Sequence, residues 1–347
     1  MNARSTDSEV SEPQLVVQAH SVSRALNIIG DRWSLLLLYH VFLGVRRYSD
    51  LLALTGIARS VLANRLQRLE KAGLLRRRRY QTRPPRYEYC LTVRGRDLND
   101  VAAMLIRWDR RWHPDPQSLM HFILHRGCRQ PTLPELRCAV CGEPVLAREV
   151  EWRPGPGAGV DPHPGPRAHR RSSLAEDSAS ALLLLQRSFD ILGDRWTAMT
   201  VAAAFYRHRR FGEFQAALGI ATNILSERLA RLVELGVLER GADARDGYRL
   251  TEQGLDLFPI IVTLLRWGDR WLAGRKGPPL LLFHRRCGAL LQPVAACDAC
   301  GETLAYGDLQ LSPEAEDALW KTAAATLPAA PRVPAGRRGS GRRSPGG

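Results

Sequence analysis

The sequence repeats itself over most of its length, and this duplication restricts the folds that the chain can adopt. Residues 29–33, Ile-Gly-Asp-Arg-Trp, return as Leu-Gly-Asp-Arg-Trp at 192–196, an offset of 163 residues. Further along the chain the offset falls to 159, so that Trp108 and Trp112 return as Trp267 and Trp271. The four lost residues fall in one loop, where a duplicated fold tolerates a deletion most easily. We therefore expect two copies of one domain.

Each copy contains the pattern of two helices joined by a glycine turn and followed by a hairpin. In the first copy residues 48–54 suit a short helix, Gly56 supplies a tight turn, and residues 58–72 form an amphipathic run whose leucines recur at i, i+4 and i+7. Residues 76–91, rich in arginine around a Pro-Pro pair, predict two strands of a basic wing. This order is that of a winged helix-turn-helix, whose second helix enters the major groove.

The composition favours a polyanionic partner. The chain has 347 residues, enough for two or more domains, and a net charge of +15 that comes mostly from arginine. DNA is the first candidate partner and an anionic membrane surface the second. No apolar run approaches the roughly 18 residues that span a bilayer, and the N-terminus shows no signal-peptide pattern. We therefore expect a cytoplasmic, nucleoid-associated protein with no membrane partner, whose seven cysteines favour metal ligation over disulfides.

The predicted second helix presents a polar and basic face opposite its leucines. Residues 58–72 carry four cations against one Glu, and the wing at 76–88 carries six Arg against one Glu, which gives net charges of +3 and +5. Asn and Gln suit adenine edges, and Arg or Lys suits guanine. The helix residues expected to contact DNA are Arg59, Ser60, Asn64, Arg65, Gln67 and Lys71. The wing residues expected to contact phosphates are Arg76, Arg77, Arg78, Arg79, Arg83 and Arg86.

The second copy lacks this positive charge. Its equivalent helix, residues 221–235, and its wing, residues 239–249, each sum to zero. Glu227 and Glu234 fall on the face that would meet DNA, where phosphates repel carboxylates, although Glu can also accept a hydrogen bond from cytosine. We expect the first copy to do most of the base reading and the second chiefly to pair, through the helix around Trp267 and Trp271, with a first copy of the same or another chain.

The cysteines form a second repeated pattern. A His-x-x-Cys pair is followed, after nine residues, by a Cys-x-x-Cys-Gly-Glu run, and the whole arrangement recurs with the same spacing. Two such pairs can close a tetrahedral His-Cys₃ site of the structural zinc type. The expected ligands are His125, Cys128, Cys138 and Cys141 in the first copy, and His284, Cys287, Cys297 and Cys300 in the second. Two alternatives stay open, namely reduced thiols in a ribbon that has lost its metal and redox or metal sensing.

These patterns predict a fold of the α+β class, mostly α, with two tandem winged helix-turn-helix domains, each followed by a small zinc-ribbon-like module. Each winged domain should begin with a helix that contains Gly-Asp-Arg-Trp and end with one long helix, at 94–112 and 253–271, whose tryptophans serve the core, a dimer surface, or both. The expected segments are a disordered N-terminus 1–16, winged domain 17–115, ribbon module 116–152, linker 153–179, winged domain 180–275, ribbon module 276–312 and a mostly disordered basic tail 313–347.

Several ordered motifs resemble the HxlR family of winged helix-turn-helix transcription regulators. They are Gly-x-x-Trp at 30–33, Arg-Arg-Tyr-x-Asp-Leu at 46–51, a Gly-Ile, Leu, Arg-Leu, Leu, Gly-Leu series over 56–74, and Pro-Pro-x-x-Glu-Tyr-x-Leu-Thr-x-x-Gly at 84–95. The resemblance covers residues 19–112 and, more loosely, 186–271. It implies a MarR-like winged fold, binding of double-stranded DNA as a dimer, and control of nearby genes.

The chain departs from that family in two ways. Many members carry a cysteine just before the first helix, whereas this chain has His20-Ser21 there, which leaves thiol sensing at that point without support. The usual member has one winged domain, so two fused copies could form either an intramolecular pseudo-dimer or a homodimer.

Taken alone, the sequence favours a sequence-specific regulator that reads the major groove with helix 58–72 and phosphates with the wing 76–88. The alternative is a protein-interaction scaffold built on winged domains with structural zinc. No nucleotide-binding glycine loop or nucleophile motif points to an enzyme.

Overall fold

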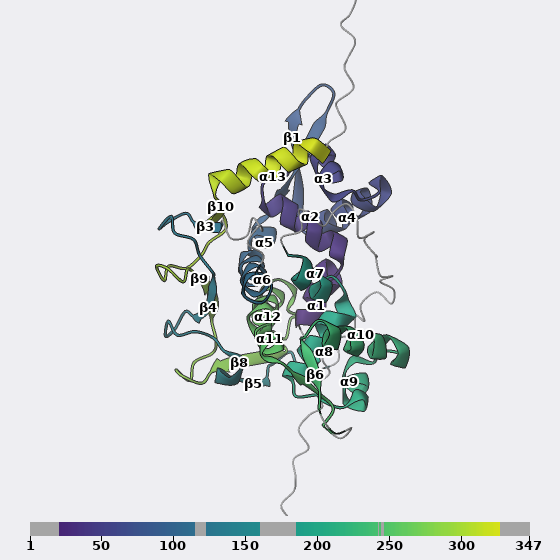
Figure 1. Cartoon of the computed structure of the whole chain (residues 1–347), viewed down its shortest axis with the longest axis vertical. Helices are drawn as coiled ribbons and strands as arrows, with labels where there is room; N and C mark the ends of the chain where they lie inside the picture. Colours follow the sequence, from purple (N-terminus) through teal and green to yellow (C-terminus); the bar gives the residue numbers. More distant parts are fainter. Residues whose placement is uncertain (1–20, 115–122, 160–184, 242, 244–245, 327–347) are drawn as a thin grey trace, which may run out of the picture.

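The computed structural model describes residues 21–114, 123–159, 185–241, 243 and 246–326, and it places the two copies one above the other (Figure 1). The first copy runs through α1 (Ser21–Ile29), α2 (Arg32–Phe42), α3 (Tyr48–Thr55), α4 (Arg59–Lys71), β1 (Leu75–Gln81), β2 (Arg86–Leu91), α5 (Val93–Arg96) and α6 (Asn99–Trp112). The second runs through α7 (Gln186–Leu192), α8 (Arg195–Phe205), α9 (Phe211–Leu218), α10 (Thr222–Glu234), β6 (Leu238–Arg240), β7 (Tyr248–Leu250), α11 (Glu252–Leu255) and α12 (Phe258–Leu272). The mostly helical α+β fold with two winged helix-turn-helix domains is confirmed.

The Gly-Asp-Arg-Trp stretch lies at a break between two helices, and the prediction of one helix through it is wrong. Gly30 follows the end of α1, and Asp31 caps α2 by accepting a hydrogen bond from the Ser34 amide at 3.1 Å. Asp194 caps α8 in the same way, with the Thr197 amide at 3.0 Å. A carboxylate at this position satisfies a backbone donor that has no partner within the helix.

The long closing helices are also divided. In each copy a threonine starts a one-turn helix, α5 or α11, by accepting from the amide of a glycine three residues later. Two residues then separate that turn from the main helix, α6 or α12. The expected single helices at 94–112 and 253–271 are therefore each a short turn followed by a longer helix.

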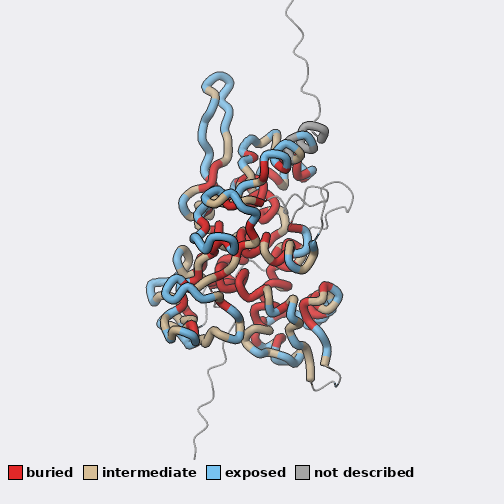
Figure 2. Tube along the Cα trace, turned by 60° about the vertical axis from the view of Figure 1, so that its left-hand side comes forward, coloured by how far each residue is buried: buried red, intermediate tan, exposed pale blue. Residues whose placement is uncertain are grey.

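The two copies pack together through their first and last helices. Helix α1 lies along α12, and α6 contacts both α12 and α7. The indole N–H of Trp108 donates to the Gln253 carbonyl at 3.0 Å, and the indole of the equivalent Trp267 donates to the Arg94 carbonyl at the same distance. Both tryptophans are buried, so the repeated tryptophan face serves as core and as the surface between copies. Buried residues continue from one copy into the other (Figure 2).

The strands that follow the winged domains are interleaved between copies. They are β3 (Ile123–His125), β4 (Glu135–Cys138), β5 (Val150–Pro154), β8 (Leu280–His284), β9 (Pro293–Ala296) and β10 (Leu309–Leu311), with a short 3₁₀ turn at Ala147–Glu149. Each antiparallel pair, β3 with β10, β4 with β9 and β5 with β8, joins a strand of one copy to a strand of the other. The two ribbon modules expected at 116–152 and 276–312 are therefore one shared layer of three two-stranded sheets, which runs along the left and lower left of Figure 1.

Two further boundaries differ from expectation. Residues 153–159 belong to the shared layer, because β5 extends to Pro154 and the amides of Gly155 and Gly157 donate to the carbonyls of Pro279 and Pro278 at 3.0 Å. The tail expected to be disordered from 313 begins with α13 (Pro313–Thr326), which packs against α3. The predicted disorder of 1–16 and most of the linker lie outside the described residues, as does the remainder of the tail. None of the described helices has the length and hydrophobicity to cross a membrane.

Candidate nucleic-acid interface and metal centres

Helix α4 presents the face that its leucine spacing predicts. Gly56 ends α3 with a φ of 60°, a left-handed conformation that glycine adopts without strain and that turns the chain into α4. Leu62, Leu66 and Leu69 are buried. Five of the six helix residues expected to contact DNA are exposed, namely Arg59, Ser60, Asn64, Gln67 and Lys71.

Arg65 is the exception on this helix. Its Nε lies 2.9 Å from Oδ1 of Asp31, the residue that caps α2, and the side chain is 20% exposed. The second copy repeats the pair, since Arg228 of α10 donates to Asp194, the cap of α8. In both copies this arginine therefore joins the second helix of the motif, α4 or α10, to the helix that precedes the motif, α2 or α8. The geometry gives Arg65 a positioning role and does not favour the predicted base contact.

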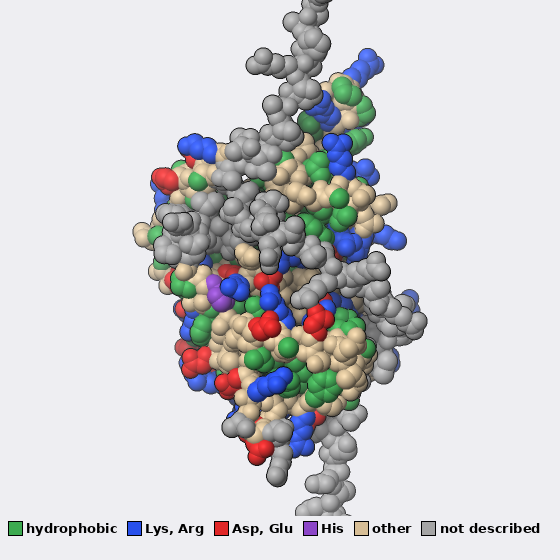
Figure 3. All heavy atoms as spheres, turned by 45° about the vertical axis from the view of Figure 1, so that its right-hand side comes forward, with side chains coloured by type: hydrophobic (Ala, Val, Ile, Leu, Met, Phe, Trp, Pro, Cys, Tyr) green, Lys and Arg blue, Asp and Glu red, His purple; other side chains and the backbone are tan. Residues whose placement is uncertain are grey.

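The basic wing is an exposed hairpin that projects from the first copy (Figure 2). Strands β1 and β2 pair in an antiparallel register that sets Arg77 opposite Tyr89 and Arg79 opposite Tyr87. All six predicted wing arginines, Arg76, Arg77, Arg78, Arg79, Arg83 and Arg86, are exposed. In the space-filling view, Lys and Arg side chains follow the projecting hairpin at the upper right (Figure 3).

The six wing arginines are not equivalent. Arg77 lies 2.9 Å from a carboxylate oxygen of Glu70, and Arg78 forms an ion pair with Glu88. Among the described residues the other four have no carboxylate within ion-pair distance. Because a paired guanidinium has already exchanged part of its hydration for a carboxylate, the four unpaired arginines are the stronger candidates for phosphate contact.

The second copy offers a different surface on the same side of the molecule. Helices α4 and α10 both lie toward the right-hand side of Figure 1, away from the shared strand layer. The predicted positions Asn223, Glu227, Ala230 and Glu234 of α10 are exposed, as are Thr222 and Ser226, and Arg231 is paired with Asp190 at 3.4 Å. Asp and Glu side chains stand among the cations in the lower half of Figure 3.

All eight predicted metal ligands come together in two clusters, but the expected grouping within each copy is wrong. One cluster joins His125 and Cys128 of the first copy to Cys297 and Cys300 of the second. The other joins Cys138 and Cys141 to His284 and Cys287. In each cluster the four ligand atoms lie within 4.8 Å of one another, so each cluster could hold a metal ion. The strand pairing between copies produces this exchange, because β3 and β4 each lie against a strand of the other repeat.

The distances within the clusters fit a tetrahedral ion. His125 Nδ1 lies 3.3 Å from Sγ of both Cys128 and Cys300, and the two sulfurs of Cys128 and Cys297 are 3.9 Å apart. A tetrahedron with Zn–S of about 2.3 Å and Zn–N of about 2.0 Å places neighbouring ligand atoms roughly 3.5–3.8 Å apart. A disulfide would instead bring two sulfurs to about 2.05 Å. In the second cluster His284 Nδ1 lies 3.3 Å from Cys141 Sγ and 3.6 Å from Cys287 Sγ.

The local backbone also suits thiolate ligands. Gly142 and Gly301, which follow the last cysteine of each Cys-x-x-Cys, adopt φ values of 75° and 77° and close the turn around the cluster. Burial opposes ionisation of Cys138, but hydrogen bonds from the backbone amides of residues 140 and 141 lower the pKa of its thiol below the ordinary value. Outside the first cluster, a carboxylate oxygen of the exposed Glu302 lies 3.9 Å from Nε2 of His125, close to the ring but beyond hydrogen-bond distance.

Comparison with known proteins agrees with the winged-domain geometry. The family model described as HxlR-like helix-turn-helix matches residues 28–117 and 191–276, which together are just over half of the chain. The chain belongs to the HxlR-like helix-turn-helix family. Both matched segments include a helix-turn-helix and its wing, so this HxlR-like chain carries the family domain twice.

Curated relatives of this HxlR-like chain are described as uncharacterized HTH-type transcriptional regulators. One from Mycobacterium bovis and one from Mycobacterium tuberculosis are each 41% identical over 140 residues, which cover 40% of this chain and 89% of the relative. One from Synechocystis is 36% identical over 26% of this chain and 68% of its own length. The family and these relatives are transcription regulators rather than enzymes, and they favour a DNA-binding regulator over the scaffold alternative.

Some residues of this HxlR-like site are not evident from the motifs alone. The Asp31–Arg65 and Asp194–Arg228 pairs join residues 34 positions apart, and their only sequence signal is that both members recur at the repeat offset. Glu302 recurs as Glu143, yet Glu143 pairs with Arg286 at 2.8 Å instead of a histidine. Repetition identifies such residues as candidates but does not identify their partners.

Proposed function

We propose that one chain of this regulator binds DNA as an intramolecular pseudo-dimer that reads sequence mainly through its first copy. Helix α4 enters the major groove with Asn64 and Gln67 toward the base edges, and the wing β1–β2 follows the phosphates. The observation that carries this proposal is the exposed polar face of α4 next to a wing with four unpaired arginines. Under this proposal the partner is double-stranded DNA of the nucleoid, in the cytoplasm.

The neutral face of α10 supports a lesser role for the second copy. Glu227 and Glu234 would approach the phosphates with the wrong charge, and the second wing is only three residues long on each strand. Helix α12 and helix α1 form an extensive contact between copies. We infer that the second copy chiefly pairs with the first and orients it.

We also propose that the two clusters hold structural zinc. Each site has four protein ligands and no position left for a substrate, which is the arrangement of structural rather than catalytic zinc. Because each ion would bind ligands from both copies, zinc would hold the two repeats together, and its binding energy would contribute to the stability of their pairing.

A footprint on a DNA duplex selected from a random pool tests whether the first copy does most of the sequence reading. We expect strong protection of one half-site per chain. Asn64→Ala should weaken specific binding by about 1–3 kcal/mol, because it removes a base contact, whereas Asn223→Ala at the equivalent position should change little. Non-specific DNA measured in parallel controls for loss of folding. Two equally protected half-sites under one chain, with equal losses from both substitutions, would contradict the asymmetric proposal.

A further inference from the structure

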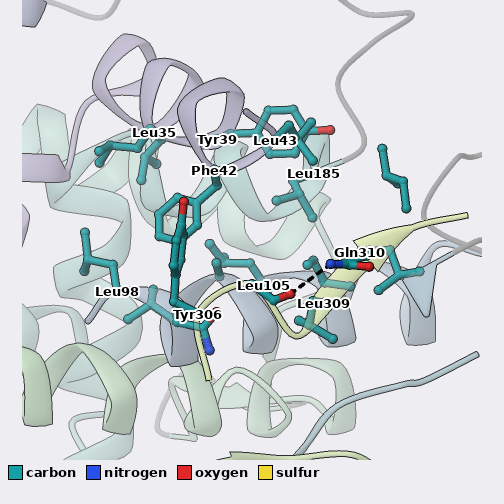
Figure 4. A pocket seen from close by; sticks show the side chains of 18 of the residues that line it. Leu35, Tyr39, Phe42, Leu43, Leu98, Leu105, Leu185, Tyr306, Leu309 and Gln310 are labelled. Atoms are coloured by element: carbon teal, nitrogen blue, oxygen red, sulfur yellow. Dashed lines mark hydrogen bonds between the residues drawn. The ribbon is translucent and has the colours of Figure 1, made fainter. Parts of the chain in front are cut away.

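A cavity of about 190 Å³ lies beneath α2 of the first copy, between α6 and the paired strands β3 and β10. Tyr39 and Phe42 enter it from α2, Leu105 from α6, and Leu309 from β10 of the second repeat (Figure 4). The cavity therefore exists only because a strand of one copy packs against the winged domain of the other. An engineered apolar cavity of about 150 Å³ is known to bind benzene, so this one has room for a small organic molecule.

Two polar side chains of the lining donate to the protein itself. The Asn99 amide donates to the Leu304 carbonyl at 2.9 Å, and the Gln310 amide donates to the Gly307 carbonyl at 3.3 Å. Tyr39 is 7% exposed, and its hydroxyl has no hydrogen-bond partner among the described residues. Burial raises the pKa of Tyr39, so this hydroxyl stays protonated and can donate or accept. The hydroxyl oxygen is enclosed by protein atoms, however, so Tyr39 presents its ring and not its oxygen to the cavity.

The lining also restricts the charge of an occupant. Among the described residues that line this cavity none is charged, and most are leucine, isoleucine, valine or aromatic. An ionised ligand would lose its hydration without gaining a counter-charge. We propose that this cavity is a binding site for a small, neutral, mostly apolar molecule.

The equivalent position in the second copy has diverged. A second cavity of about 470 Å³ lies between α8, α12 and β5, where Ala202 replaces Tyr39 and Ile261 replaces Ala102. Glu151, Arg207 and Arg285 line this second cavity, so it is charged where the first is apolar. The two cavities therefore provide a matched pair in which only the first meets the requirements of a neutral ligand.

Helix α2 connects the first cavity to the DNA-binding helix α4. One face of α2 lines the cavity, and the same helix packs against α3 and α4. The cap of α2, Asp31, holds Arg65 of α4. If α2 can take two placements and the ligand binds more tightly to one of them, ligand binding would favour that placement. The shift of α2 would move α4 and change the affinity for DNA. This regulatory step rests on the proposed DNA-binding function, whereas ligand binding itself does not.

Titration of the full zinc-loaded chain with 2-naphthol and with naphthalene tests the site without DNA. We expect saturable binding of one 2-naphthol per chain. Naphthalene should bind with a similar Kd, and the charged probe naphthalene-2-sulfonate should bind at least roughly tenfold more weakly, because the lining offers no counter-charge. Ala102→Trp should fill the cavity and weaken both neutral probes by roughly tenfold or more, whereas Ile261→Trp at the equivalent position of the second cavity should leave both unchanged.

Several results would overturn the inference. They are the absence of saturable binding to the wild-type chain, an equal loss from Ala102→Trp and Ile261→Trp, or binding of naphthalene-2-sulfonate as tight as that of 2-naphthol. Thermal unfolding of each variant separates lost binding from lost folding. Saturating 2-naphthol should also change the Kd for the selected DNA, and an unchanged Kd would contradict the coupling to α4. A chain that binds no DNA without ligand would contradict the proposed function, while the naphthol titration would still decide the ligand site.

Discussion

The arginines of the wing differ in how much of their charge remains for a phosphate. Arg79 is exposed with no carboxylate nearby among the described residues, whereas Arg78 is paired with Glu88. Each phosphate contact releases about one counterion, so the dependence of affinity on salt counts such contacts. The wing can therefore be analysed one residue at a time.

We expect Arg79→Ala to reduce the slope of log affinity against log salt by about 1, through the loss of one phosphate contact. Titrations of a duplex over a series of salt concentrations provide the measurement. Arg240→Ala in the second wing is the control, because its guanidinium lies over the ring of Tyr248 in a hairpin of zero net charge. If the slope and affinity are unchanged in Arg79→Ala, the wing does not contact DNA as proposed.

A second residue-scale prediction concerns Asp109, which is buried between α6 and α7. Burial raises the pKa of its carboxyl to about 7, although hydrogen bonds from Ser188 partly offset the effect. A carboxyl with a higher pKa in the folded than in the unfolded chain binds more protons when folded. The stability that the folded protein gains from the protonated carboxyl is therefore fully present below about pH 4, the pKa in the unfolded chain. It is lost as the pH rises through about 7, the pKa in the folded chain.

Asp109→Asn removes this titration and keeps an acceptor for the Ser188 amide. We expect the variant to be more stable than the wild type at pH 8, by on the order of 1 kcal/mol or more, and to lose that advantage near pH 4. Denaturant unfolding at the two pH values would show this. An equal change in stability at both values would mean that the carboxylate is not penalised in the folded protein.

For single residues, the sequence predicts which side chains are exposed better than it predicts which side chains pair with one another. Helical periodicity identifies the exposed face of α4 because the burial of three leucines fixes the rotation of the helix. It does not identify the Arg65–Asp31 pair, since Arg65 belongs by spacing to the flank of the exposed face. Only the packing of α4 on α2 brings the two side chains together.

At the scale of elements, the tryptophans of α6 and α12 join the two copies. Each indole donates to a backbone carbonyl near the start of the other copy's closing helices. Trp108→Phe should lower the free energy of unfolding by roughly 1–3 kcal/mol, because a half-buried carbonyl loses its donor. Trp267→Phe should cost a similar amount, since its contact is the same by symmetry.

Denaturant unfolding measures both variants, with Trp196→Phe as the control. Trp196 is only partly buried, and the guanidinium of Arg195 lies over its ring. If the control loses as much stability as Trp108→Phe and Trp267→Phe, the loss reflects ring size rather than the contacts between copies.

Elements with strong local signals are predictable, and elements that depend on distant partners are not. The amphipathic runs of α4 and α10 and the arginine-rich hairpin follow from local pattern. Strands β3 and β10 are three residues long, and each pairs with a segment more than 180 residues away. Nothing within so short a segment specifies which copy supplies its partner.

At the scale of the whole molecule, the duplication makes the grouping of metal ligands ambiguous in the sequence. Both copies carry His-x-x-Cys and Cys-x-x-Cys with the same spacing, so any His-x-x-Cys can close a tetrahedral site with either Cys-x-x-Cys. The path of the strands removes the ambiguity by bringing each pair to the complementary pair of the other copy. The eight candidate ligands could be predicted from the sequence. The tertiary structure was needed to show which four of them share a site.

The exchanged grouping makes a prediction that separates it from grouping within a copy. The wild type should contain two zinc ions per chain, and Cys128→Ser or Cys138→Ser should each remove one and lower thermal stability. The double variant of Cys128 and Cys297 should still retain one ion, because both residues ligate the same site. The double variant of Cys128 and Cys138 should retain none, because the two residues belong to different sites. Grouping within a copy predicts the opposite result for both double variants, so elemental analysis of these two proteins decides between the arrangements. A wild type without metal, folded and with all cysteines reactive as free thiols, would contradict zinc itself.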